Sequence, residues 1–473
     1  MCNNFKQNHW CCFYIGRLSN SFIFSNFANL YCNNILMIDN TVFHNKKVAF
    51  HTLGCKLNFA ETSAIGKKMS DEGFVKARAG EEADVCVINT CSVTDTADRK
   101  CRQAISKLNR LHPNAIMVVT GCYAQLKPEE ISKIEGVDLV LGANEKFSIL
   151  DYLRNIESDK PAEVHTTKIN KIKEFEPSCS RDDRTRYFLK VQDGCDYYCT
   201  YCTIPFARGR SRSANIAQTI EKAMEAIDAG AKEIVLTGVN IGDFGKNTGE
   251  SFFELVKAFD VIDRDVRFRI SSIEPNLLTD DIIDYVVNSK HIMPHFHIPL
   301  QSGTNEVLEL MKRKYNRELF AHKVQKIKTL MPHAFIGVDV IVGVRGETAA
   351  LFEESCRFID SLDISQLHVF TYSERAGTKM LDIEQNTPVA ERKKRSDILH
   401  LLSDKKTKAF YESQIGKTYP VLWESRHNGE SMVGFTNNYI KVERPFDKNR
   451  VNTVEMVTLG GWNEEKSVLV VEK

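Results

Sequence analysis

Short apolar segments alternate with stretches of helical periodicity through most of this chain, and this alternation restricts the fold more than any other feature. In the first part of the sequence the apolar, β-rich segments are residues 48–53, 84–89, 116–120 and 137–141. Helical patterns at 61–72 and 94–111 separate them, with Thr94 or Asp95 as a helix cap. Strands separated by helices pair in parallel, so residues 46–158 are predicted to form a parallel α/β domain.

A second and longer series of strands and helices follows. Its predicted strands are residues 188–192, 233–237, 266–271, 295–299, 335–342 and 366–371, each followed by a helical pattern. Six such units, compared with the eight of a closed barrel, predict an open (β/α)6 partial barrel over residues 181–411. The charged segment 155–186 between the two series shows little periodicity and is interpreted as a linker.

The two ends of the chain differ from this α/β pattern. Short alternating strands in residues 413–473 predict a small C-terminal β-barrel, and the overall fold class is α/β. Residues 1–45 show no sustained period and are interpreted as a disordered N-terminal extension in which Met37 is an alternative start. No function is expected of the cysteines there, which are Cys2, Cys11, Cys12 and Cys32.

Composition excludes several classes of protein. The chain has 63 Lys and Arg against 62 Asp and Glu, so any nucleic-acid contact has to be local. No apolar run approaches the roughly 18 residues that span a bilayer, and no secretory leader is recognisable. The expectation is a soluble, cytoplasmic protein whose 14 cysteines stay reduced and serve metal or iron–sulfur chemistry.

Three of these cysteines, Cys195, Cys199 and Cys202, fall within eight residues directly after a predicted strand. Loops at the carboxyl ends of barrel strands build active sites, so this trio is assigned a catalytic role. A structural zinc site needs four protein ligands, whereas three thiolates on an iron–sulfur cubane leave one iron open to another ligand. A zinc site with a remote fourth ligand is the alternative.

A second trio is recognisable only from its position relative to the strands. Cys55, Cys91 and Cys122 each lie just beyond the carboxyl end of a predicted strand, and these ends meet at one edge of a parallel sheet. Gly54 and Gly121 precede two of them and permit a sharp turn. By contrast, Cys86, Cys101, Cys179 and Cys356 are expected to be small buried apolar residues.

The spacing C-x3-C-x2-C, with Tyr201 before the last cysteine, resembles the signature of the radical S-adenosylmethionine (SAM) superfamily. The resemblance implies a [4Fe–4S] cluster on Cys195, Cys199 and Cys202 whose free iron binds SAM. It further implies that residues near the ends of the following strands bind the cofactor, namely Tyr201, Gly238, Asn240, Ser272 and Glu274. The segment 337–343 resembles the strand along which the adenine of SAM packs.

The segments 52–58, 89–94 and 120–125 around the second trio resemble the N-terminal domain of the methylthiotransferases. The resemblance covers residues 46–473 and implies a second [4Fe–4S] cluster on Cys55, Cys91 and Cys122 and a C-terminal TRAM domain that binds RNA. Residues 54–58, 237–242 and 297–303 are most similar to the branch that adds a methylthio group to C2 of N6-threonylcarbamoyladenosine at position 37 of tRNA. Lys56 stands where the isopentenyladenosine branch usually has glutamine.

Three alternative functions remain open: methylthiolation of isopentenyladenosine, methylthiolation of a ribosomal-protein aspartate, and a non-catalytic iron–sulfur protein that binds RNA. The implied partners are the anticodon loop of tRNA, SAM, an electron donor and a sulfur source, the last two of unknown identity. Candidate phosphate contacts are Arg208, Arg210, Arg212 and the basic stretch 391–410. Trp423, Phe435 and Tyr439 are candidates for stacking on bases or for core packing.

Overall fold

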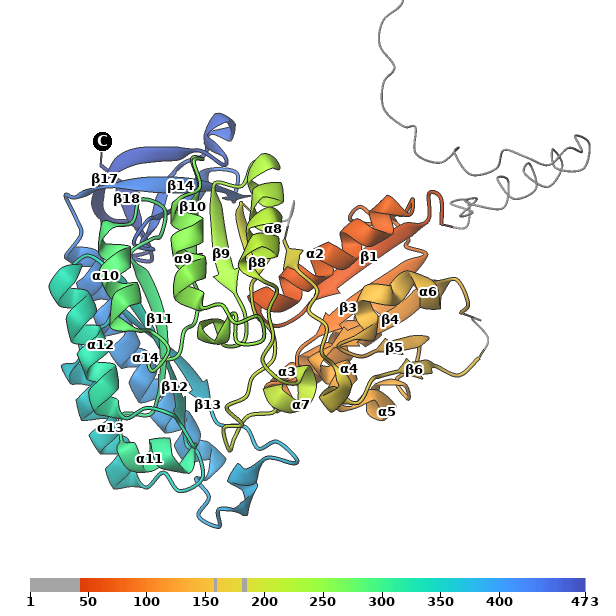
Figure 1. Ribbon diagram of the computed structural model, residues 1–473, viewed down its shortest axis with the longest axis horizontal. Helices are drawn as coiled ribbons and strands as arrows, with labels where there is room; N and C mark the ends of the chain where they lie inside the picture. The colour runs from red at the N-terminus through yellow and green to blue at the C-terminus, as the bar shows by residue number, and fades with distance from the viewer. Residues whose placement is uncertain (1–42, 157–159, 181–184, 473) are drawn as a thin grey trace, which may run out of the picture.

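The computed structural model describes residues 43–156, 160–180 and 185–472 (Figure 1). The expectations for residues 1–42, including Cys2, Cys11, Cys12 and Cys32, lie outside the described residues. Among the residues described, no helix is both long and apolar enough to cross a membrane.

The N-terminal sheet is parallel throughout, as predicted. Its strands, in spatial order, are β2 (Val75–Lys76), β1 (Lys47–Thr52), β3 (Val85–Thr90), β4 (Ile116–Gly121), β5 (Leu139–Leu141) and β6 (Glu163–His165). One face packs on α2 (Lys56–Asp71) and α6 (Ile149–Leu153). The other packs on α3 (Asp95–Leu111), α4 (Cys122–Leu126) and α5 (Pro128–Ile131). Thr94 caps α3 by accepting a hydrogen bond from the backbone of Ala97, which confirms one of the two predicted caps.

The interpretation of 155–186 as a linker is wrong for part of that segment. β6 pairs with β5 and extends the N-terminal sheet, and β7 (Ser178–Cys179) pairs antiparallel with the first barrel strand. β6 is a short, partly exposed edge strand. It therefore lacks the run of apolar residues by which strands are recognised in a sequence. The short 3-10 helices η1 (Glu145–Ser148) and η2 (Ile169–Lys171) also lie in this half of the chain.

The central region has the six parallel strands that the sequence predicts. They are β8 (Arg186–Lys190), β9 (Glu233–Thr237), β10 (Arg267–Ile270), β11 (His295–Gln301), β12 (Phe335–Val342) and β13 (Gln366–Thr371). Strands β8 to β10 form one ladder and β11 to β13 another, and isolated bridges at Phe268–Ile292 and Ser272–His297 join the two. The barrel is therefore open between β8 and β13.

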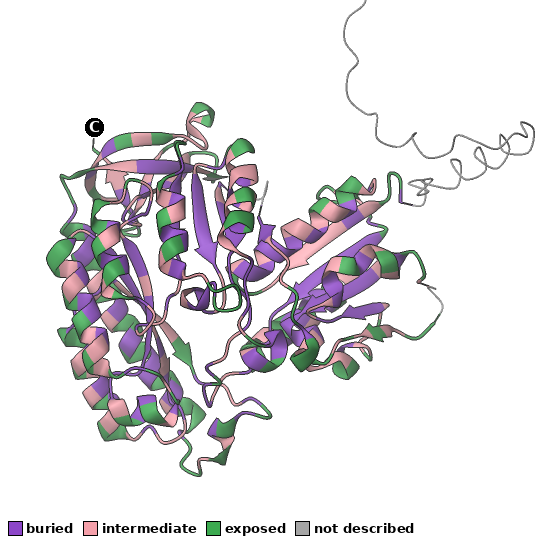
Figure 2. Ribbon diagram, in the orientation of Figure 1, coloured by how far each residue is buried: buried purple, intermediate pink, exposed green. Residues whose placement is uncertain are grey.

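Helices cover the outside of this partial barrel, and in Figure 2 their outward faces are exposed while most of the strands are buried, β13 excepted. They are α8 (Ile216–Asp228), α9 (Phe252–Asp260), α10 (Asp280–Asn288), α11 (Asn305–Leu310), α12 (Arg317–Leu330), α13 (Ala349–Ser361) and α14 (Val389–Glu412). Shorter helical turns are α7 (Ile204–Arg208), η3 (Ile241–Asp243) and η4 (Lys379–Asp382).

The C-terminal region is a closed five-stranded β-barrel, as predicted. Around the barrel the strands are β14 (Thr418–His427), β15 (Ser431–Thr436), β16 (Lys441–Pro445), β18 (Leu469–Val471) and β17 (Val454–Trp462), with η5 (Lys448–Arg450) before β17. Arg267 and Arg269 at the start of β10 donate hydrogen bonds to the carbonyl oxygens of Phe435 and Asn437, at 2.9 Å each. Both guanidinium groups also pair with the buried Glu233. The small barrel is thus held at the amino-terminal ends of the large barrel's strands.

Candidate active site

The first cysteine trio lies in the loop between β8 and α7. Cys195, Cys199 and Cys202 form no disulfide. Burial, and after it the neighbouring thiols, raise the pKa of Cys202 to about 12, and burial likewise raises the pKa of Cys195 to about 12. Gly194 allows the tight turn here, because it has φ +71° and a Cβ would lie 2.0 Å from the carbonyl oxygen of Arg210. A group of positive charge bound to these thiols would relieve their mutual repulsion.

Gln192 connects this loop to the next one, a function that sequence reasoning missed. Its amide nitrogen donates to the carbonyl oxygens of Asp193 and Gly194 at 2.9 and 2.7 Å. Its amide oxygen accepts from the backbone N–H groups of Val239 and Asn240 at 3.0 and 2.8 Å. A fully buried glutamine at the end of β8 therefore fixes the cysteine loop and the 238–240 turn relative to each other.

The proposed SAM-binding residues have different environments. Asn240 is buried, and neither side-chain amide atom has a hydrogen-bond partner in the described chain, as expected of a group that awaits a ligand. A Cβ on Gly238 would lie 2.9 Å from the carbonyl oxygen of Gln192, so a larger residue does not fit. Ser272 is half-buried and bridges to His297. Tyr201 packs against the small apolar cluster around Met311, and burial raises its pKa.

Arg313 links Glu274 to the first trio, and no sequence motif indicated it. Its guanidinium forms an ion pair with Glu274 and lies 3.1 Å from Sγ of Cys199. Burial raises the pKa of Glu274, while Arg313 acts in the opposite direction. A carboxylate and a guanidinium beside the cysteines can bind the amino and carboxylate groups of an amino-acid ligand.

The second trio is gathered where three strands of the N-terminal sheet end. Cys55 directly precedes α2, Cys91 follows β3, and Cys122 is the first residue of α4. Burial, then the thiols of Cys122 and Cys55, raise the pKa of Cys91 to about 12. A Cβ on Gly54 would lie 2.7 Å from Cβ of Cys91, so the glycine lets the Cys55 turn approach Cys91 closely. The charges of Cys55 and Cys122 both act on Cys91, so the three thiols lie near one another although at least 30 residues separate each from the next in the sequence.

Among the described residues, neither trio forms a group whose ligand atoms all lie within 4.8 Å of one another. With Zn–S bonds of about 2.3 Å, two thiolates on one zinc ion lie at most about 4.6 Å apart. Within the described chain, His297, Asp339 and His368 are the one group of three metal-ligating residues whose ligand atoms all lie within 4.8 Å of one another. A cubane, in contrast to a single zinc ion, spreads its ligands over several irons.

A buried ion network joins the segments that carry the two trios. Arg208, at the end of α7, contacts Glu61 of α2 at 3.0 Å and Asp193 at 3.0 Å, and donates to Oδ1 of Asn58 at 2.7 Å. Lys146 and Lys190 also bind Glu61, at 2.6 and 3.1 Å. Helices α4 and α7 pack together, which brings Cys122 close to the segment that follows Cys202. The charge of Arg208 lowers the pKa of Cys122, although burial raises it overall.

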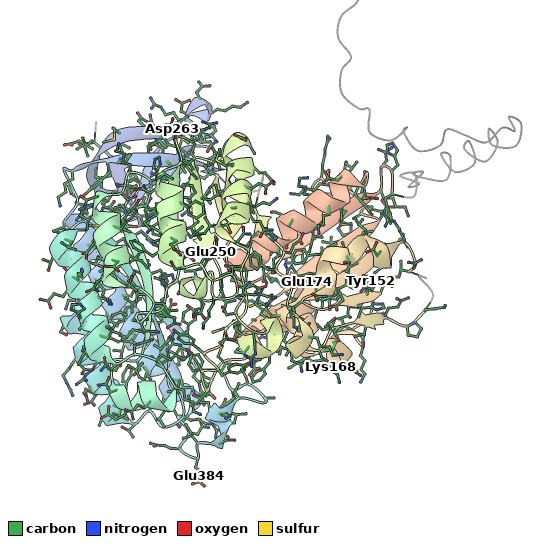
Figure 3. The ribbon with its side chains drawn as sticks, in the orientation of Figure 1. Tyr152, Lys168, Glu174, Glu250, Asp263 and Glu384 are labelled. Carbon is green, nitrogen blue, oxygen red and sulfur yellow. The ribbon has the colours of Figure 1, made fainter. Side chains whose placement is uncertain are left out.

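This network corrects the expectation that Arg208 and Arg212 contact phosphates. Both are buried, and Arg212 pairs with Asp193 at 3.0 Å and donates to the carbonyl oxygen of Glu174 at 2.7 Å. Glu174 lies between the two halves of the molecule in Figure 3. Arg210 is exposed and remains a candidate.

The basic stretch 391–410 lies on α14, and two of its arginines likewise form ion pairs within the protein. Arg392 and Arg395 are buried and pair with Glu374 and Glu347 at 2.7 Å each. The prediction of phosphate contacts now rests on the exposed lysines of this helix, among them Lys393 and Lys394.

The three aromatic residues that were candidates for base stacking differ in how far they are buried. Trp423 is fully buried in the core of the C-terminal barrel, so core packing is right for it and base stacking is wrong. Phe435 and Tyr439 are partly exposed, and the Arg186 guanidinium lies over the Phe435 ring at 4.2 Å. Cys86, Cys101 and Cys179 are buried as expected, and Cys356 is only partly so.

The comparisons with known proteins agree with this geometry. The model of an uncharacterized protein family, UPF0004, matches residues 47–142, and that of the radical SAM superfamily matches residues 189–359. The fold is similar to that of the radical SAM methyltransferase TsrM from Kitasatospora setae, with a TM-score of 0.53, 13% identity, and 69% of this chain and 73% of that one covered. Fold and site together define the class as a radical SAM enzyme, whose resident cofactors are SAM and a [4Fe–4S] cluster.

Curated relatives narrow the class. Threonylcarbamoyladenosine tRNA methylthiotransferase MtaB of Bacillus subtilis is 39% identical over 90% of this chain and 97% of its own length. The protein of the same name from Aquifex aeolicus is 37% identical over 84% of this chain and 96% of its own. A tRNA-2-methylthio-N(6)-dimethylallyladenosine synthase of Desulfitobacterium hafniense is 29% identical over 88% and 96%. The chain belongs to the radical SAM methylthiotransferase family, whose enzymes transfer a sulfur-containing group.

Proposed function

We propose that this enzyme adds a methylthio group to C2 of N6-threonylcarbamoyladenosine at position 37 of tRNA. The proposal is supported by two separate trios of free thiols that lie on segments joined by the α4–α7 contact. The relatives of highest identity named above act, by their names, on this nucleoside. The dimethylallyladenosine enzyme is less similar, which favours the threonylcarbamoyl substrate.

We propose a [4Fe–4S] cluster for each trio, with Cys195, Cys199 and Cys202 holding one and Cys55, Cys91 and Cys122 the other. Bound there, the clusters would supply reductive cleavage of SAM and a site for the transferred sulfur, which adenine C2 requires because it bears only hydrogen and no leaving group. The residues of this chain would orient SAM. Gln192 holds the 238–240 turn, in which Asn240 offers a side-chain amide without a partner. Arg313 and Glu274 are placed to bind the amino-acid end of SAM.

A groove opens on the surface beside the C-terminal barrel. Its volume is about 950 Å³, and it lies between β8 and the C-terminal barrel, with Arg186, His427, Phe435 and Lys441 among its lining residues. Cationic and aromatic side chains suit a single-stranded loop whose bases are unstacked. We propose that the C-terminal barrel is an RNA-binding TRAM domain and that the anticodon loop enters here, with the target base turned out of its stack.

Nucleoside analysis of tRNA tests the substrate. Mass spectrometry of tRNA from cells with and without the gene should show 2-methylthio-N6-threonylcarbamoyladenosine only when the gene is present. An unchanged tRNA nucleoside profile, or a change confined to isopentenyladenosine or to a ribosomal protein, would contradict the proposal. Failure of anaerobically reconstituted, reduced protein to form 5′-deoxyadenosine from SAM would instead favour a non-catalytic RNA-binding protein.

An iron count tests the two clusters. Reconstituted protein should hold about eight irons, and a Cys55→Ala, Cys91→Ala, Cys122→Ala variant about half of them. The variant should still cleave SAM because the first trio is intact, but should not modify tRNA. A Cys86→Ala variant is the matched control, since Cys86 is buried inside β3 away from both trios. Full iron content in the triple variant would remove the second cluster from the proposal.

A further inference from the structure

A second, smaller cavity lies deeper than the groove and shares two of the groove's lining residues, Arg186 and Phe188. Its volume is about 260 Å³. Its other lining residues are Gly54, Lys56, Phe59, Val235, Arg269 and Tyr439. The N-terminal domain, the large barrel and the C-terminal barrel all contribute to it, and it reaches the turn that carries Cys55.

Positive charge dominates this cavity. Arg186, Arg269 and Lys56 line it, and the two guanidinium groups lie 5.5 and 4.9 Å from the ring of Tyr439. Although burial acts in the opposite direction, the charges of Arg186, Lys56 and Arg269 lower the pKa of Tyr439. No carboxylate lines the cavity itself in the part of the chain that the structure describes.

The three cations differ in whether the protein already supplies a counterion. Arg186 pairs with Glu424 at 2.8 Å, and Arg269 pairs with Glu233 at 2.9 Å. The side-chain ammonium of Lys56 has no hydrogen bond or salt bridge to any described residue. Asp339, whose charge also acts on Lys56, is bound by His297 at 2.6 Å. A partly buried ammonium without a counterion is unfavourable unless a ligand supplies one.

We propose that Lys56, supported by Arg186 and Arg269, binds the carboxylate of the threonylcarbamoyl group and so determines which modified adenosine this enzyme accepts. The inference rests on the proposed function and adds the residue that recognises the substrate. Lys56 directly follows Cys55, so a group held by it lies beside the proposed sulfur-donating centre. An isopentenyl group has no charge and would leave the ammonium unpaired, which disfavours that substrate.

A backbone phosphate would present the same anionic chemistry, so the experiment has to separate the two sources. The substrates are tRNA carrying N6-threonylcarbamoyladenosine and the same tRNA with that carboxylate converted to the neutral carboxamide. The phosphates are identical in both. The holoenzyme should prefer the carboxylate in kcat/KM, and in the Kd of the anticodon stem-loop, on the order of 10- to 100-fold, the value of a hydrogen bond to a charged group.

Lys56→Gln should remove this preference by lowering kcat/KM on the carboxylate substrate to the level of the carboxamide, with the loss mostly in KM. Lys56→Arg should restore part of it. Lys67→Gln, on the exposed face of the same helix, is the matched control and should keep the preference. Iron content and thermal unfolding verify that Lys56→Gln is assembled.

Two outcomes would overturn the inference. An equal loss on both substrates would assign Lys56 to a phosphate or to structure, and an unchanged preference would exclude it from carboxylate binding. If the unmutated enzyme modified neither tRNA, the proposed function would fail, and the stem-loop Kd values would still show whether Lys56 distinguishes the carboxylate.

Discussion

At the scale of single residues, the site depends on polar groups that have no reactive function of their own. Gln192 uses both ends of its amide to join the loop of Cys195 to the turn of Asn240. Arg313 does the same for Glu274 and Cys199 with its guanidinium. Neither role can be recognised from the sequence, because an isolated glutamine or arginine belongs to no periodic pattern or motif spacing that would indicate it.

Gln192→Ala should destabilise the protein by about 3 kcal/mol, because the carbonyl of Gly194 and the N–H groups of Val239 and Asn240 lose their hydrogen-bond partner. The KM for SAM should rise by roughly tenfold, since the 238–240 turn loses its anchor. Urea unfolding and the rate of 5′-deoxyadenosine formation at varied SAM measure the two effects. Gln325→Ala, at an exposed position, is the control. A normal KM in the variant would show that the turn holds its shape without Gln192.

At the scale of elements, α2 joins the two halves of the active site. Its N-terminal end carries Cys55 and Lys56, and one turn later Glu61 enters the buried ion network with Arg208, Lys146 and Lys190. Phe59 and Ala60 pack beside Phe188 and Val235 of the barrel. The helix therefore begins at Lys56, earlier than the predicted start at residue 61, because tertiary contacts stabilise its first turn without a side-chain cap.

Glu61→Gln should destabilise the protein by about 3–5 kcal/mol at pH 7, because it leaves buried cations uncompensated. These cations lower the pKa of Glu61 well below the ordinary 4.5 against the effect of burial, so its stabilisation is present above pH 4.5 and is lost as the pH falls below that value. The difference in unfolding free energy between the two proteins should therefore narrow in acid. Glu72→Gln, which breaks an exposed pair with Arg154, should cost less than about 1 kcal/mol. A difference independent of pH would contradict the charged role of Glu61.

At the scale of the whole molecule, the N-terminal domain closes the open side of the partial barrel. It contacts the β8 edge through α2 and the β13 side through Arg375, which binds Ser92 at 2.7 Å and Asp98 at 2.9 Å. Ser92 directly follows Cys91, so this second contact positions the second trio relative to the first. In Figure 1 the N-terminal sheet stands beside the barrel with α2 between them.

Arg375→Ala should weaken the contact between the N-terminal domain and the barrel, and so uncouple SAM cleavage from methylthio transfer. We expect SAM cleavage to persist while methylthio transfer falls by roughly tenfold or more, since a small displacement between reacting groups costs much of the rate. The ratio of modified tRNA to 5′-deoxyadenosine measures the uncoupling. Arg357→Ala, on an exposed helix face, should leave the ratio unchanged. A parallel fall in both products would point to general unfolding.

The sequence alone determined the parallel α/β domain, the six-stranded partial barrel, the five-stranded C-terminal barrel and the family, because periodicity and closely spaced motifs are local properties. It also indicated both cysteine trios, since strand ends can be located from the strands. The sequence did not determine that Arg208 and Arg212 lie in a buried network, that Trp423 belongs to a core, or that Lys56 faces Arg186, Arg269 and Tyr439. Only the tertiary structure decided these points, because a charged or aromatic side chain has the same sequence signal on a surface as in a buried ion pair, and its role follows from partners elsewhere in the chain.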